Sequence, residues 1–208
     1  LAAHQPAARH RFGASPRWPR PARRGARDRA PEARALSALR RAGLVGFGAI
    51  AENAYLPAFS ALGIDMTAVA DVSASRRDAA ASAVPSARVY SSHHEMLSRE
   101  KNSVDFVVVA TPPLHHAAAV MDGLGAGLHV LCEKPLTLNP LDFNAIKSKA
   151  AARSLCVYSI DNWAFSPQWA ALLYVVSSGR LGTVRDASIE VLRTKPSASA
   201  LPGDWRKD

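Results

Sequence analysis

The stretch Leu-Val-Gly-Phe-Gly-Ala-Ile-Ala occupies residues 44–51 and decides the fold. A short apolar run leads into the spacing Gly46-x-Gly48-x-x-Ala51, and residues 51–62 follow as a candidate helix. Strand, glycine turn and helix in this order are typical of a dinucleotide-binding site. Gly46 permits a tight turn, because only glycine takes a positive φ without steric cost. Gly48 lets the backbone approach a pyrophosphate, and Ala51 lets the helix pack closely while its N-terminus faces the phosphates.

A second apolar run ends in an acidic residue. Residues 66–70 read Met-Thr-Ala-Val-Ala, and Asp71 follows, 25 residues after Gly46. An acidic residue at about this distance, at the tip of the second strand, binds the ribose hydroxyls of an adenosine. A turn aspartate is the alternative, but the glycine pattern favours the ribose role.

The excess charge of the chain is concentrated in its first 41 residues. The formal net charge is +9 over 208 residues. Residues 1–41 contain 11 arginines, no lysine and two acidic residues, whereas residues 42–208 contain 15 basic and 15 acidic residues. The body of the chain therefore has no basic surplus that would attract a phosphate backbone, and we expect no nucleic-acid partner.

Residues 1–41 form a leader rich in Ala, Arg and Pro, which we expect to be disordered. It could be a dispensable tail, an Arg-rich targeting peptide or an upstream extension. Arg40-Arg41 before an apolar run also resembles a twin-arginine export signal, but the glycine pattern favours the first strand of a fold. No run reaches the roughly 18 apolar residues of a membrane span, so we expect no membrane association.

From residue 43 onward, short apolar runs alternate with segments of helical character. Strands are predicted at 43–47, 66–70, 87–90, 104–110, 128–132 and 155–160. Helices are predicted at 51–62, 74–83, 93–100, 114–125 and 139–152. This alternation predicts an α/β protein with a Rossmann-type, doubly wound, mostly parallel sheet over residues 42–160.

A different pattern begins after residue 160. Residues 167–178 predict a helix, which Gly179 would end, and residues 183–194 predict one long strand. The alternation in this strand suits an antiparallel sheet with one wet face. We interpret residues 161–208 as the beginning of a truncated α+β second domain.

The cysteines and histidines predict no special chemistry. Cys132 and Cys156 each lie in an apolar run, and two cysteines make neither a disulfide scaffold nor metal spacing. Buried free thiols in a reducing cytoplasm fit them. The seven histidines form no H-x-x-x-H pattern with an acidic partner, so the sequence predicts no metal site.

Two further loops follow strands at the sheet edge where ligands of open α/β sheets bind. The first, residues 110–116, reads Ala-Thr-Pro-Pro-Leu-His-His. Its prolines stiffen the backbone, and Thr111 can offer a hydroxyl to a cofactor. His115 and His116 also fit the start of a helix in solvent.

The second loop, residues 132–135, reads Cys-Glu-Lys-Pro. The ammonium of Lys134 can bind a substrate hydroxyl or carbonyl and transfer a proton, and Glu133 would hold it in place. The bond before Pro135 could be cis, which would fix the direction of the lysine. A surface ion pair at a strand end is the alternative.

Four segments, in this order and spacing, resemble one known family. They are GFGAIA at 46–51, VADVSAS at 69–75, VVVATPPLHHAAAV at 107–120 and HVLCEKPLTLN at 129–139. Over residues 43–195 the chain resembles the Gfo/Idh/MocA oxidoreductases, and the Glu-Lys-Pro tripeptide is the most specific element of the match.

This resemblance implies NAD(P)-dependent hydride transfer at a carbon of a sugar, cyclitol or related compound. Lys134 would orient the substrate and transfer a proton. The implied cofactor-binding residues are Gly46, Phe47, Gly48, Ala49, Ile50, Ala51, Asp71, Arg76, Thr111, Pro112, His116, Glu133, Lys134 and Asn162. Asp71 favours NAD, because a carboxylate repels a 2′-phosphate, although Ser73, Arg76 and Arg77 could hold that phosphate.

The chain departs from the family in one respect. The family usually supplies a further Asp and His from a glycine-rich segment of its second domain, and this sequence stops before such a segment. We therefore expect either a fragment of a longer homo-oligomeric enzyme or a truncated product. The alternative function is a non-catalytic NAD(P)-binding module. An adenosylmethionine-dependent methyltransferase shares the glycine loop, but it would not explain the loops at 110–113 and 133–135.

Overall fold

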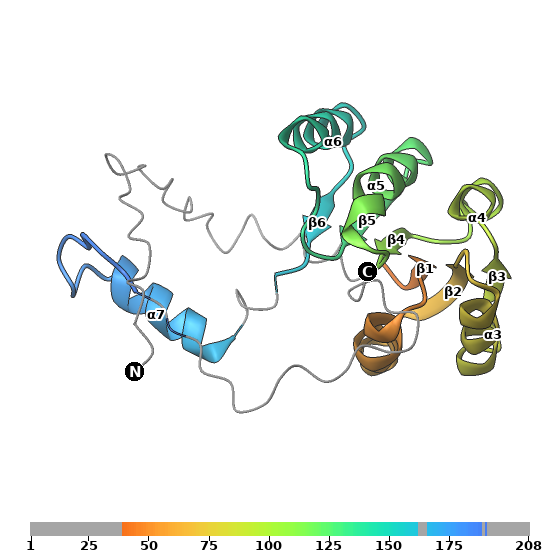
Figure 1. The fold of residues 1–208 in the computed structure, drawn as a ribbon, viewed down its shortest axis with the longest axis horizontal. Coiled ribbons are helices and arrows are strands. Elements are labelled where there is room, and N and C mark those ends of the chain that lie inside the picture. The colour runs from red at the N-terminus through yellow and green to blue at the C-terminus, as the bar shows by residue number, and fades with distance from the viewer. Residues whose placement is uncertain (1–38, 162–165, 189, 191–208) are drawn as a thin grey trace, which may run out of the picture. The chain divides into compact units, whose positions relative to one another are not determined.

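Six parallel strands form one sheet in the computed structural model, which describes residues 39–161, 166–188 and 190 (Figure 1). The strands are β1 (Arg41–Val45), β2 (Asp65–Ala70), β3 (Arg88–Tyr90), β4 (Phe106–Val109), β5 (His129–Cys132) and β6 (Val157–Ser159). Their spatial order is β3-β2-β1-β4-β5-β6, and every pair is parallel. The direction of winding reverses between β1 and β4, so the doubly wound Rossmann-type sheet is confirmed.

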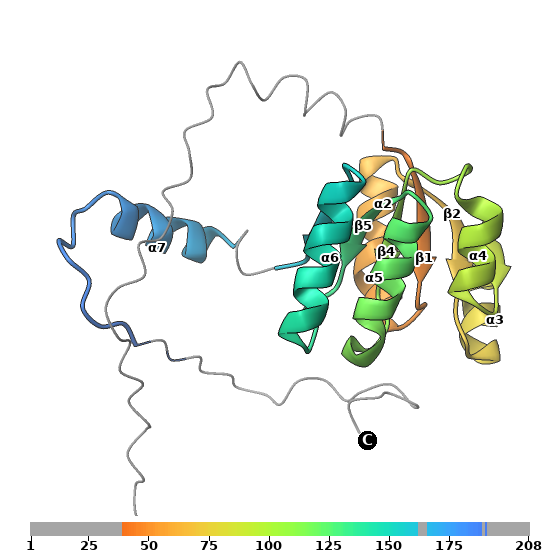
Figure 2. The same ribbon diagram turned by 90° about the horizontal axis from the view of Figure 1, so that it is seen from above.

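Helices cover both faces of the sheet. One face carries α2 (Leu56–Leu62) and α3 (Ala74–Ala83), and the other carries α4 (His93–Glu100), α5 (His116–Gly125) and α6 (Pro140–Ala152) (Figure 1). Figure 2 shows α4, α5 and α6 side by side in front of the strands. A π-helical turn, η1 (Ala51–Tyr55), leads into α2, and a 3-10 turn, η2 (Pro113–His115), leads into α5. None of the described helices has the length and apolar character needed to span a bilayer.

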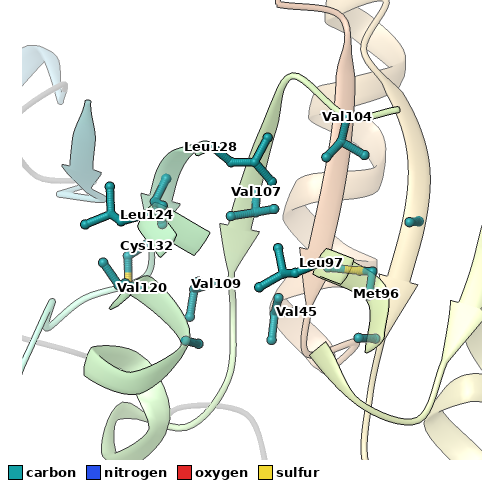
Figure 3. Close-up of a cluster of buried hydrophobic side chains, with 14 of the residues drawn as sticks. Val45, Met96, Leu97, Val104, Val107, Val109, Val120, Leu124, Leu128 and Cys132 are labelled. Carbon is teal, nitrogen blue, oxygen red and sulfur yellow. The ribbon is translucent and has the colours of Figure 1, made fainter. Parts of the chain in front are cut away.

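Alternate positions along the strands fill two buried clusters, one on each face. Under α4, α5 and α6 the cluster includes Val45, Val107, Val109, Leu97, Val120, Leu124 and Cys132 (Figure 3). Under α2 and α3 it includes Leu44, Val69, Val108, Phe47 and Phe59. Burying each such side chain stabilises the fold by about 1.5–3 kcal/mol relative to exposure, which explains why the central strands are apolar on both faces.

Local signals place most element boundaries where the sequence predicts them. The helices at 74–83 and 93–100 begin and end at the predicted residues. Asn139 caps α6, because its side-chain oxygen accepts a hydrogen bond from the Leu141 amide at 2.9 Å and Pro140 takes the first helical position. Gly179, at φ 74°, follows α7 (Pro167–Ser177) as expected.

Three predictions need correction. β1 lies two residues earlier than predicted, because Gly46 takes a φ of 92° and ends the strand, while the apolar pattern continues into the buried side chain of Phe47. No strand forms at 183–188 or at residue 190, which are the described part of the predicted strand at 183–194. Cys132 is buried, but Cys156 is exposed beside the edge strand β6, and both are free thiols.

A buried carboxylate fastens β3 to α4. Glu100 is only 4% exposed, and its carboxylate accepts hydrogen bonds from the Arg88 guanidinium and the Tyr90 hydroxyl. The hydrogen bond from Arg88 contributes most to lowering the pKa of Glu100 to about 2. Arg88 thereby keeps the carboxylate ionised where burial alone would favour the neutral acid.

Candidate functional site

Loops that follow β1, β4 and β5 meet at one edge of the sheet, called here the carboxyl edge. β1 and β4 are neighbours in space, although β2, β3 and their helices separate them along the chain. The carboxyl ends of parallel strands around such a reversal form the crevice in which ligands of open α/β sheets bind. The loop after β2, which carries Asp71, lies at the same edge.

The fold requires glycine at the first position of the loop after β1, whether or not a ligand is bound. Gly46 takes a φ of 92°, and an added Cβ would lie 2.8 Å from the Ala110 carbonyl oxygen. Its amide donates to the Ala70 carbonyl at 2.8 Å, which ties the loop to the end of β2. A side chain here would be strained by the backbone conformation and would also clash with the loop after β4.

The fold leaves room for a side chain at Gly48, the second glycine of this loop. An added Cβ at Gly48 would have nothing within 4 Å. The Gly48 carbonyl accepts hydrogen bonds from Ala51 at 2.9 Å and Glu52 at 3.2 Å, so the helical turn starts here. Ala51 is fully buried, Ala49 is half-buried and Ile50 remains 41% exposed. The open space beside Gly48, at the start of a helical turn, suits the close approach of a phosphate.

Asp71 holds the glycine loop in shape. One carboxylate oxygen accepts a hydrogen bond from the Phe47 amide at 2.7 Å, and the other accepts one from the Ser73 amide at 2.8 Å. The carboxylate is half-buried at the end of β2, as predicted for a ribose-binding residue. Asp71 therefore links the glycine loop to the loop in front of α3.

Arg76 reaches the same loop from α3. Its Nε donates to the Phe47 carbonyl at 2.6 Å, its guanidinium lies 5.7 Å from the centre of the Phe47 ring, and Nη2 is 2.9 Å from a Glu52 carboxylate oxygen. Nη2 is buried and, in spite of this ion pair, makes no well-directed hydrogen bond within the described chain. Arg77 donates to the carbonyls of Asp71 and Val72, both at 2.9 Å. Both arginines therefore bind backbone carbonyls around Asp71.

The loop after β4 contributes a buried hydroxyl. Ala110 donates to the Val45 carbonyl at 2.8 Å, which fixes the start of the loop beside β1. The Oγ1 atom of Thr111 is buried and has no hydrogen-bond partner within the described residues. An unpaired buried hydroxyl is unfavourable, so its position is consistent with a ligand that completes the hydrogen bond. The neighbouring Pro112 is half-buried.

His116 lies beneath this loop. Its ring is fully buried, with Nε2 at 2.7 Å from the Thr111 carbonyl oxygen and Nδ1 at 2.7 Å from the Pro135 carbonyl oxygen. Carbonyl oxygens only accept, so the ring donates to both only when both nitrogens carry a proton. The resemblance implies that His116 serves the cofactor, but the fold uses both ring nitrogens to join the loops after β4 and β5. Neighbouring His115 is exposed.

The loop after β5 presents Lys134 to solvent. The Lys134-Pro135 peptide bond is cis, which is the form that the sequence suggested. Glu133 accepts hydrogen bonds from the Tyr55 hydroxyl at 2.9 Å and from the Lys134 amide at 3.3 Å. It does not pair with the Lys134 ammonium, which has no hydrogen bond or ion pair among the described residues. The exposed Lys134 ammonium therefore remains available to a ligand.

Tyr55 is a site residue that sequence reasoning missed. It lies in η1, 78 residues from Glu133, and only the fold brings the two together. Burial, followed by the nearby Glu133 carboxylate, raises the pKa of Tyr55 well above its usual value, so the hydroxyl stays protonated and donates. Burial likewise raises the pKa of Cys132 to about 12, which keeps this thiol inert below the site. The predicted contribution of Asn162 lies outside the described residues.

Several relatives share this architecture. Inositol 2-dehydrogenase of Rhodococcus erythropolis is 36% identical over 121 residues, which are 58% of this chain and 34% of the relative. The structure of the Bordetella pertussis WlbA dehydrogenase with NADH and UDP-GlcNAcA has a TM-score of 0.64 and 26% identity, covering 68% of this chain and 43% of that one. KijD10, a 3-ketoreductase of Actinomadura kijaniata whose variant was solved with TDP-benzene and NADP, has a TM-score of 0.62 and 27% identity, covering 69% and 45%.

The matched part of this chain is less than half of such proteins. Among the first curated relatives, the match covers 28% to 43% of the relative's own length. A family model described as "Oxidoreductase family, NAD-binding Rossmann fold" matches residues 40–161. This match spans more than half of the chain and contains all six strands of the sheet. The protein therefore belongs to the Gfo/Idh/MocA family of oxidoreductases.

Proposed function

We propose that the carboxyl edge binds NAD(P) and supports hydride transfer between the nicotinamide and a hydroxyl or carbonyl carbon of a sugar, cyclitol or related compound. The observation that carries the proposal is the glycine loop after β1, which Asp71 holds at the Phe47 amide while the space beside Gly48 stays open. Lys134 lies on the loop after β5 of the same sheet, where a substrate beside the nicotinamide would sit.

The residues at this edge fit the parts of the coenzyme one by one. The loop at 46–51 suits the pyrophosphate, because Gly48 lets the backbone approach and exposed Ile50 offers an apolar side chain for the coenzyme to cover. Asp71 suits the adenosine ribose. The unpaired hydroxyl of Thr111, with Pro112 beside it, suits the nicotinamide end.

When bound, the nicotinamide supplies the hydride acceptor or donor. In the oxidation the neutral amine of Lys134 takes the proton of the substrate hydroxyl and becomes an ammonium as the carbon loses hydride, and in the reduction this ammonium returns the proton to the oxygen. The exposed ammonium has no competing partner among the described residues, so it is free to bind the substrate oxygen. Glu133 acts indirectly, because its carboxylate holds the Lys134 backbone and accepts from Tyr55.

We infer a preference for NAD over NADP. The Asp71 carboxylate would repel a 2′-phosphate, and Arg76 and Arg77 are engaged with the carbonyls of Phe47, Asp71 and Val72. NADP would require at least one arginine to leave these carbonyls.

The two free thiols also fit the reducing cytoplasm expected from the sequence.

A coenzyme-binding module without turnover is the second candidate. It is favoured because the Lys134 ammonium makes no hydrogen bond or ion pair with another acid–base side chain among the described residues. The two candidates share the coenzyme site and differ only in the fate of bound substrate.

Calorimetric titration of the chain with NADH and with NADPH tests the coenzyme site that both candidate functions share. We expect saturable binding of NADH at least about tenfold tighter than that of NADPH, a difference of about 1.4 kcal/mol. Asp71→Ser should reduce the difference between the affinities for NADH and NADPH, because the carboxylate that repels the 2′-phosphate is gone. A folded chain that binds neither coenzyme contradicts the proposal. Absorbance assays with polyols and nucleotide sugars then separate the enzyme from the module.

A further inference from the structure

A cluster of two histidines and one aspartate lies outside the coenzyme site. His93 and His94 are the first residues of α4, and Asp122 lies on α5. His93 Nε2 is 2.9 Å from Asp122 Oδ2, and His94 Nδ1 is 3.4 Å from the same oxygen. One potential ligand atom from each residue lies within 4.8 Å of the others.

The convergence of the two rings is unusual for neighbouring helical residues. Successive side chains on a helix point about 100° apart, so His93 and His94 would ordinarily face different surroundings. Here the ring centres are 4.1 Å apart, the planes are tilted by 34°, and one nitrogen of each ring faces the same carboxylate oxygen. A single hydrogen bond from His93 to Asp122 would not require His94 to turn the same way.

We propose that His93, His94 and Asp122 bind a divalent transition-metal ion of the zinc class. Imidazole nitrogen together with carboxylate oxygen is a ligand set that suits such ions. Ligand atoms about 2.0–2.1 Å from a tetrahedral ion lie about 3.3 Å from one another. The observed nitrogen–oxygen separations of 2.9 and 3.4 Å lie on either side of this value, and all three ligand atoms lie within 4.8 Å of one another.

The surroundings leave room for the remaining ligands of the ion. His94 and Asp122 line a shallow groove of about 330 Å³ between α4 and α5, together with Leu97, Lys101 and Gly125. The side chain of His93 is 24% exposed and that of His94 is 70% exposed. An ion with three protein ligands can therefore enter from solvent and keep water in its open position.

An ion at this position would join two helices that cover the same face of the sheet. α4 and α5 both pack on the cluster that contains Leu97 and Leu124. The ion should bind the folded arrangement more tightly than an unfolded chain, in which Asp122 is separated from the adjacent His93 and His94, so it should raise the melting temperature. The site does not include any residue assigned to the coenzyme.

Zinc titration of the chelator-stripped chain tests this proposal by calorimetry and by thermal melting. The Cys156→Ser background is used throughout, because an exposed thiol can itself bind zinc. The test variants are His94→Gln and Asp122→Asn. The matched control is His115→Gln, which removes an exposed histidine that lies outside the cluster.

We expect the background chain and His115→Gln to bind zinc with the same affinity and to melt several degrees higher with zinc. Loss of a residue that only supports a ligand costs about 10–100-fold in metal affinity, so His94→Gln and Asp122→Asn should each weaken binding at least tenfold. Both should also lose the zinc-dependent rise in melting temperature. Melting in chelator checks that each variant folds. Unchanged zinc affinity in both test variants overturns the proposal, whatever the outcome for NADH.

Discussion

The two sides of the carboxyl edge are built differently. On the side of β1 and β2, Asp71 and Arg76 bind the glycine loop and its neighbours through hydrogen bonds of 2.6–2.8 Å, although Arg76 Nη2, paired with Glu52, makes no well-directed hydrogen bond within the described residues. On the side of β4 and β5, the Thr111 hydroxyl and the Lys134 ammonium have no partner in the described part of the chain. The first side is formed before any ligand arrives, whereas the second offers polar groups that the protein does not use.

This difference separates residues that support the fold from residues that serve only a ligand. Buried polar groups are nearly always paired in folded proteins, so an unpaired one calls for an explanation outside the chain. Substitutions on the β1–β2 side should therefore alter stability and coenzyme binding together. Substitutions of the unpaired groups should alter function while leaving stability unchanged.

The largest contrast is expected between the two glycines of the first loop. Gly46→Ala should destabilise the fold by about 2–5 kcal/mol, because the Cβ would contact Ala110 and the backbone would be strained. Gly48→Ala should leave stability within about 0.5 kcal/mol, because its Cβ meets open space. Gly48→Ala should still lower the affinity for NADH at least about tenfold, since the Cβ enters the space proposed for the pyrophosphate. Urea unfolding and calorimetry measure the two effects. Equal stabilities of the two variants would contradict the distinction.

His116 connects the two loops of the less satisfied side, and its removal should be the next largest effect. His116→Ala removes the ring that lies 2.7 Å from both the Thr111 and Pro135 carbonyl oxygens and opens a cavity, so we expect the fold to lose about 2–4 kcal/mol of stability. His115→Ala is the matched control and should change stability by less than about 0.5 kcal/mol. Urea unfolding of both variants measures the difference. A neutral His116→Ala would mean that the buried ring does not hold the loops together.

Local sequence patterns predict the scaffold well and the contacts between distant residues poorly. Caps, apolar periodicity and glycines act over a few residues, which is why the bounds of α3 and α4 are predicted correctly. Tyr55 and Glu133 are 78 residues apart, and His93 and Asp122 are 29 apart, so no local pattern relates them. The expectation that Glu133 would hold the Lys134 side chain is not met among the described residues, because the Glu133 carboxylate accepts from the Tyr55 hydroxyl and the Lys134 amide instead.

Lys134 should affect chemistry without affecting the fold. Lys134→Met keeps the length of the side chain but removes the ammonium, which makes no contact that stabilises the described chain. We expect stability within about 0.5 kcal/mol and NADH affinity within about threefold of the unmodified chain. Turnover of any substrate found for the protein should fall by about 100-fold or more, as is typical when a positioned acid–base group is lost. Unaltered turnover in this variant would remove Lys134 from the proposed mechanism.

The smallest effect should come from Thr111, and it has opposite signs for stability and binding. Thr111→Val replaces a buried hydroxyl that has no partner by a methyl group of similar shape, so stability should be unchanged or rise by up to about 1 kcal/mol. If the hydroxyl bonds the coenzyme, NADH affinity should fall by about 3–10-fold, the value of one hydrogen bond of about 1 kcal/mol. Thr67→Val on β2, which removes only a long hydrogen bond of 3.4 Å to the Asp65 carbonyl, is the control and should change stability and NADH affinity little. A residue that weakens the fold yet strengthens ligand binding serves the ligand. Loss of stability in Thr111→Val would instead assign the hydroxyl to the protein, and the contrast between the two sides of the edge would then rest on Lys134 alone.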